Sequence, residues 1–130
     1  MSSIFVDSSK TFDVTVYWKQ DGKRLVVLDE KPVGEEKVES VTVAFTFPDY
    51  QTERQIQRAS ITVDRNGTSV LDNLAMQSVT FQLLAKKWDL QDDKGEPILL
   101  NPDNTGKVHP VIMRGIITRM YIELAECGYV

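Results

Sequence analysis

The spacing of the apolar residues changes once along this chain, from a period of two in the first half to three or four in the second. Between residues 12 and 18, apolar and polar side chains alternate, as in a strand with one buried face. Between Asp72 and Trp88, apolar side chains recur at the spacing of a helix. We therefore expect an α+β fold, with a small antiparallel sheet packed against two longer C-terminal helices.

The first half predicts the strands of that sheet. Residues 12–29 are expected to form a hairpin, because Gly22 lies in a turn sequence and adopts positive φ at little cost. The stretch 41–47 is rich in β-branched and aromatic residues and is expected to be the third strand. The charged stretch 29–40 is expected to form a mobile loop, and residues 1–11 a flexible arm.

Shorter elements are expected in the middle of the chain. Asp49 or Thr52 is a suitable N-cap for a surface helix over residues 51–59. Residues 64–67, with the sequence Asp-Arg-Asn-Gly, are typical of a tight turn. They predict a second hairpin over residues 61–70.

The second half predicts two longer helices. The first follows Asp72 as N-cap, and its apolar stripe extends from Leu74 to Trp88. The final helix starts at Pro110, with His109 just outside it. The apolar residues of this helix cover more than half of its circumference. A three-stranded sheet alone does not bury an apolar surface of that width.

Length and charge limit the classes of protein to which the chain can belong. Its 130 residues favour a single domain over residues 1–130. The formal net charge of -4 argues against a nucleic-acid partner, which needs a basic surface. No apolar run approaches the roughly 18 residues that span a membrane, and residues 1–7 do not resemble a signal peptide. The lone Cys127 excludes an intramolecular disulfide.

No combination of residues predicts catalysis. The chain has one His and one Cys, His109 and Cys127, and no motif links a third group to them. The loop 89–96 has carboxylates near a glycine, but Gln91 and Lys94 interrupt the acidic spacing of an EF-hand, which favours a solvated turn over a calcium site. We expect no enzymatic activity, no cofactor, no metal site and no small-molecule substrate.

The apolar residues therefore predict a core and a protein-binding surface. The large aromatic residues are expected mainly to pack against one another in the core: Phe45, Phe47, Phe81 and Trp88. Trp88, together with Ile117 and Tyr121 on the wide apolar side of the final helix, is also a candidate partner-binding residue. We expect an interaction or assembly protein, and homo-oligomers are compatible with this expectation.

A set of short motifs runs through residues 41–125. The strand 41–47 is followed by Pro48-Asp49 and a polar helix that contains arginine. Further along the chain come Trp88-Asp89-Leu90, the acidic turn Asp92-Asp93-Lys94-Gly95-Glu96-Pro97, Asn101-Pro102-Asp103-Asn104, and Val108-His109-Pro110 before the last helix. Together these motifs resemble those of the tail-assembly chaperones and related small morphogenesis proteins of tailed bacteriophages.

The resemblance implies a non-enzymatic role in tail morphogenesis, with binding to the tape-measure protein and recruitment of tail-tube subunits. The hairpin at 12–29 is richer in β structure than this family leads one to expect. This hairpin therefore keeps a second function possible, that of a structural subunit of the virion in the tail, neck or baseplate. Such subunits join their neighbours through sheet edges and extended arms. A host enzyme or ligand-binding domain is a third alternative. We expect the protein in the host cytoplasm, or in the virion if it is structural.

Overall fold

The computed structural model describes residues 4–31, 34 and 37–129. The expected arm 1–11 and the expected loop 29–40 therefore lie partly outside the described residues. The elements follow in this order: β1 (Thr11–Asp21), β2 (Arg24–Leu28), β3 (Glu39–Thr46), α1 (Tyr50–Ser60), β4 (Ile61–Val63), β5 (Ser69–Leu71), α2 (Asn73–Leu84), β6 (Ala85–Trp88), α3 (Pro102–Thr105) and α4 (Pro110–Glu126). This arrangement confirms the α+β fold.

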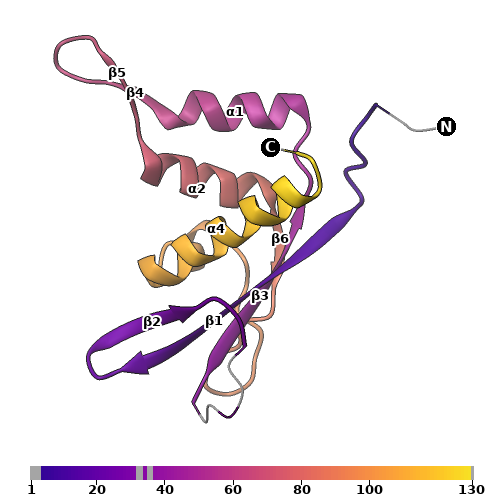
Figure 1. Cartoon of the computed structure of the whole chain (residues 1–130), viewed down its shortest axis with the longest axis vertical. Coiled ribbons are helices and arrows are strands. Elements are labelled where there is room, and N and C mark those ends of the chain that lie inside the picture. Colours follow the sequence, from indigo (N-terminus) through magenta and orange to yellow (C-terminus); the bar gives the residue numbers. More distant parts are fainter. Residues whose placement is uncertain (1–3, 32–33, 35–36, 130) are drawn as a thin grey trace.

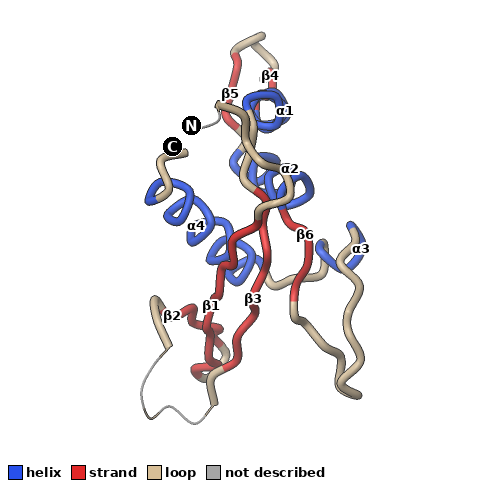
Figure 2. The backbone as a smooth tube through the Cα atoms, turned by 90° about the vertical axis from the view of Figure 1, so that its right-hand side faces the viewer, coloured by secondary structure: helices blue, strands red, loops and turns tan. Residues whose placement is uncertain are grey.

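The main sheet has four strands in the order β2-β1-β3-β6, and every neighbouring pair is antiparallel. The expected first hairpin consists of β1 and β2, and Gly22 in its turn has φ +62°. The expected third strand is β3. Figure 2 shows the strands in this order across the view, with α1 and α2 beyond one end of the sheet.

One face of the sheet forms the core with α4. Val14 lies opposite Val43, and Val16 lies opposite Val41, so these buried side chains share one face. Helix α4 packs across β1 and β2 on this face. Gly115 permits the close approach, because a Cβ at this position would lie 3.2 Å from the Cγ1 of Val27.

The fourth strand corrects the prediction that the helix stripe extends to Trp88. Helix α2 ends at Leu84, and the next four residues form β6 on the free edge of β3. Asp89 continues this pairing, because its N–H donates to the Thr42 carbonyl while its carboxylate accepts from the Thr42 N–H. The backbone hydrogen bonds that β3 offers outweigh the helical spacing of these residues.

The predicted stripe is also wrong at its beginning. Leu74 is 73% exposed, since the buried residues of α2 lie only in its last turns, where Thr80, Phe81 and Leu84 meet the core. The aromatic packing is largely confirmed, because the ring of Phe81 lies 5.9 Å from that of Phe45 and 6.1 Å from that of Trp88. The ring of Phe47 packs instead against two others, tilted against Phe12 at 4.7 Å and stacked on Tyr129 at 4.8 Å.

Helices α1, α2 and α4 begin where the sequence indicates. The carboxylate of Asp49 accepts the N–H of Thr52 at 2.8 Å, which identifies Asp49 as the N-cap of α1. Asp72 caps α2 through the N–H of Ala75. His109 caps α4. The second expected hairpin consists of β4 and β5, and it projects from the ends of α1 and α2 beyond the rest of the fold (Figure 1).

Candidate functional site

A groove of about 330 Å³ lies where α1, α2 and the C-terminal part of α4 meet the base of the β4–β5 hairpin. Its apolar lining includes Ile56, Met76, Leu84, Tyr121 and Leu124. Leu84 and Leu124 are buried, whereas Tyr121 and Met76 are half-buried. The exposed Glu53 and Gln57 of α1 also line it. An apolar floor with a polar rim is the usual composition of a protein-binding patch.

The hairpin extends this groove outward. Ile61 lies opposite Leu71, and Val63 lies two residues further along, so their side chains share one face of the hairpin. They are 52%, 59% and 67% exposed, respectively. Because Ile61 and Leu71 also line the groove, the apolar face of the hairpin and the groove are continuous. We call this combined area the hairpin–groove surface.

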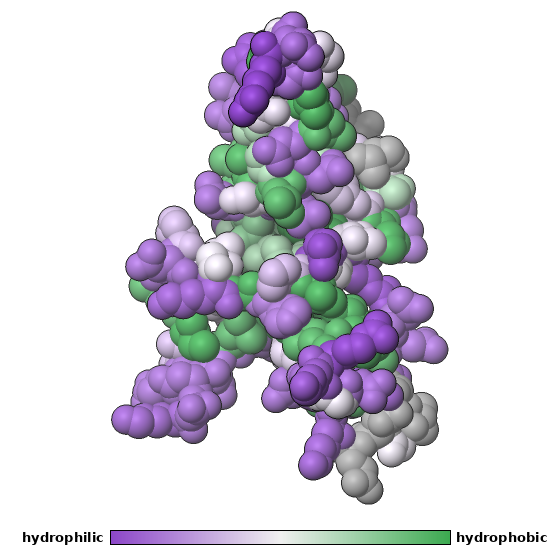
Figure 3. Space-filling model, turned by 90° about the vertical axis from the view of Figure 1, so that its left-hand side faces the viewer, coloured by the Kyte–Doolittle hydropathy of each residue, from purple (hydrophilic) through white to green (hydrophobic). Residues whose placement is uncertain are grey.

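Two three-residue strands are a marginal structure without further packing. Every residue from 61 to 71 is exposed. Figure 3 shows the side of the molecule on which the hairpin projects, with polar side chains at its top and apolar patches below them. A partner that covered the hairpin would bury apolar area that the chain itself leaves in water.

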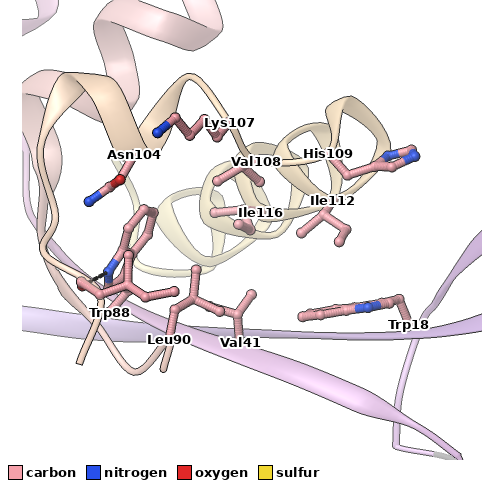
Figure 4. A pocket seen from close by; sticks show the side chains of 11 residues that line it. Trp18, Val41, Trp88, Leu90, Asn104, Lys107, Val108, His109, Ile112 and Ile116 are labelled. Carbon is pink, nitrogen blue, oxygen red and sulfur yellow. Dashed lines mark hydrogen bonds between the residues drawn. The ribbon is translucent and has the colours of Figure 1, made fainter. Parts of the chain in front are cut away.

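A second cavity, of about 260 Å³, lies between the sheet and the start of α4. Trp88 and Trp18 stand at its two ends, with Val41 between them and Lys107 and His109 on the side of α4 (Figure 4). Both indole N–H groups already have partners, the Ile98 carbonyl for Trp88 and the Glu39 carboxylate for Trp18. The cavity therefore offers mainly apolar contacts.

Among the described residues, two carboxyl groups have lowered pKa values, and both occupy turns or caps. The hydroxyl and the backbone N–H of Ser9 lower the pKa of Asp7. The backbone N–H of Thr52 lowers the pKa of Asp49. Both shifts follow from local hydrogen bonds and mark no catalytic group. Among the residues that the structure describes, no group of three or more His, Cys, Asp and Glu side chains could hold a metal ion.

The three candidate partner-binding residues do not come together. Tyr121 lines the groove, and its hydroxyl lies 3.4 Å from that of Thr80. Trp88 lines the other cavity. A partner-binding residue must be exposed, and for Ile117 the structure shows the opposite, because its side chain is 4% exposed and belongs to the core. Ile122, which is 47% exposed, is a large apolar residue that α4 presents to solvent instead.

The hairpin face is the part of the candidate site that the sequence prediction missed. The turn at residues 64–67 predicted the hairpin itself, and Ile61 and Val63 already show a two-residue period. That period indicates one apolar face but does not say whether a helix covers it. The exposure of Ile61, Val63 and Leu71 follows from the projection of the hairpin beyond α1 and α2.

The chain matches no protein-family model, and no significantly similar curated protein or solved structure was found. None of the helices that the structure describes is both long and apolar enough to cross a membrane.

Proposed function

We propose that the chain is a non-enzymatic protein of bacteriophage tail morphogenesis, similar to the tail-assembly chaperones, which binds an apolar helix of the tape-measure protein. The observation that carries this proposal is the hairpin–groove surface. Its apolar floor, formed by Leu84 and Leu124, and its exposed apolar wall, formed by Ile61 and Leu71, suit the apolar stripe of an amphipathic helix. The family and its partners come from the motifs between residues 41 and 125.

The proposed mechanism is reversible masking. A long apolar helix aggregates when its stripe is exposed to water, and a small folded domain prevents this by covering the stripe. The net charge of -4 helps to keep such a complex soluble. No covalent step is needed, and the helix is released when tail-tube subunits take the place of the chaperone.

A structural subunit of the virion is the second candidate function. The projecting β4–β5 hairpin and the free outer edge of β2 favour it, because such features join neighbouring subunits through backbone hydrogen bonds and apolar contacts. In this case, the hairpin–groove surface would be covered permanently in the assembled particle.

Co-expression with the tape-measure protein of the same source tests the proposed function. The Val63→Asp variant places a charge on the apolar face of the hairpin, whereas Thr62→Asp places the same charge on its opposite face. We expect Val63→Asp to weaken binding at least about tenfold, since burying a valine contributes roughly 1.5–3 kcal/mol. The control Thr62→Asp should keep the tape-measure protein soluble and bound.

Both side chains are exposed in the free protein, so neither variant should unfold it. Equal binding by Val63→Asp and the unchanged protein would exclude the hairpin as the binding surface. If the tape-measure protein stays insoluble beside the unchanged chain, the chaperone function itself is wrong.

A further inference from the structure

Strand β2 is an edge strand with an unusual composition. It is the outermost strand of the four-stranded sheet, and Leu25, Val26, Val27 and Leu28 form an unbroken apolar run along it. All four side chains are only half-buried. Proteins usually protect such an edge with charges, prolines or bulges within the strand, because unpaired N–H and C=O groups invite another strand. This strand has none of these within its apolar run.

The register of the first hairpin shows which backbone groups face outward. Residues Gly22 and Lys23 form a two-residue turn between the paired Asp21 and Arg24. A two-residue turn closes on a hydrogen-bonded pair, and the ladder then alternates along the strand. Residues 24, 26 and 28 therefore direct their N–H and C=O groups toward β1. Those of Leu25 and Val27 point away from β1, to the edge of the sheet that no other described strand covers.

The charges at the two ends of β2 are opposite in sign. Lys23 and Arg24 precede the apolar run, and Asp29 and Glu30 follow it. All four side chains are exposed. When such a strand pairs with an antiparallel copy of itself, the basic end of each copy meets the acidic end of the other. A peptide or partner strand of arbitrary sequence lacks this match, so the charge pattern favours a second copy of this chain.

We propose that two copies of the chain pair through their β2 strands and form one continuous eight-stranded antiparallel sheet. A two-fold axis perpendicular to the sheet places Val26 opposite Val26 of the partner subunit. Leu25 then exchanges both backbone hydrogen bonds with Val27 of the partner subunit, and Lys23 lies opposite Asp29 of the partner subunit. This register uses the outward-facing backbone groups and joins the apolar residues 25–27 of the two copies, while Arg24 lies opposite Leu28 of the partner subunit.

The proposed dimer has two physical properties that can be measured. Its short strand buries a small area, so it dissociates on dilution. Its exposed charge pairs are screened by salt, since the Debye length falls to about 3 Å at 1 M. Both properties follow from β2 alone, and the proposal does not rest on the function proposed above.

Charge reversal with rescue tests the proposal by sedimentation velocity of the full chain. The double variant Lys23→Glu/Arg24→Glu makes both ends of β2 acidic, and Asp29→Lys/Glu30→Lys makes both ends basic. Each variant alone should lose dimer, with an increase in Kd of about tenfold or more from like-charge contacts. An equimolar mixture of the two should recover dimers, because each basic end again meets an acidic one.

The matched control is Lys86→Glu/Lys87→Glu, which changes the net charge by the same amount as Lys23→Glu/Arg24→Glu at exposed positions on β6. It should dimerise as the unchanged chain does. A chain that stays monomeric at every concentration overturns the proposal. So does a dimer that survives charge reversal, or a mixture that does not recover it. These β2 variants leave Val63 and the hairpin–groove surface unchanged. A failure of the dimer proposal is therefore distinguishable from a failure of the tape-measure proposal, which Val63→Asp tests.

Discussion

At the scale of single residues, short polar side chains determine where the helices begin. Asp49 and Asp72 each accept a backbone N–H from the first turn of the following helix. Both were identifiable in the sequence, because an N-cap depends on only a few neighbouring residues. The burial of Ile117 could not be identified in the sequence, since it depends on which side of α4 meets the sheet.

The cap at Asp49 predicts a pH dependence of stability. Its pKa is lowered from 3.8 in the folded chain, so the carboxylate stabilises the fold above that pH, and this contribution disappears as the pH falls through the lower, folded value. Asn is also a good N-cap but carries no charge. We expect Asp49→Asn to lose less stability than the unchanged protein as the pH falls below about 5 and the Asp49 carboxylate takes up its proton, as measured by thermal unfolding followed by circular dichroism. Identical pH profiles would contradict the role assigned to this carboxylate.

At the scale of elements, local patterns predicted both hairpins, α1 and the start of α4. The four-residue strand β6 was missed, because its residues suit the end of a helix and its pairing depends on the distant β3. The position of β2 at the edge of the sheet could not be predicted either, since the sequence does not show which strand is outermost. The sequence does show the opposite charges at the two ends of Leu25–Leu28. Only the strand order places them on an edge strand, where they can select a pairing partner.

The contact between α4 and the sheet gives a second prediction at this scale. A Cβ on Gly115 would lie 3.2 Å from the Cγ1 of Val27 and 3.4 Å from that of Val16. A valine at position 115 has two further methyl groups to place in this contact. We expect Gly115→Val to lower the free energy of unfolding by about 1–3 kcal/mol, measured by urea denaturation. An unchanged midpoint would mean that α4 does not pack this closely on β1 and β2.

At the scale of the whole molecule, the two proposed interaction surfaces lie far apart. The β4–β5 hairpin projects at one end of the long axis, and β2 lies toward the other end (Figure 1). A dimer formed through β2 therefore leaves the hairpin–groove surface of each copy open. The Val63→Asp variant should accordingly dimerise like the unchanged chain, while the β2 charge variants should retain their tape-measure binding.

The candidate site as a whole was only partly predictable. Tyr121 does line the groove, but Trp88 lines a separate cavity, and the exposed hairpin residues Ile61, Val63 and Leu71 were not candidates. A binding surface built from several elements depends on how those elements meet. The apolar pattern of a single element shows that the element has an apolar face. Only the fold shows which of these apolar faces remain exposed to solvent.

The most direct test of the central claim, transient protein binding during tail assembly, is quantitative mass spectrometry of the native source, with purified particles separated from the soluble fraction. We expect the chain in the soluble fraction, bound to a long helical tape-measure protein, and depleted from finished particles. A fixed number of copies in purified particles would mean that the chain is a structural subunit of the virion and not a chaperone. Absence of the chain from every phage-related fraction would contradict the proposed function altogether.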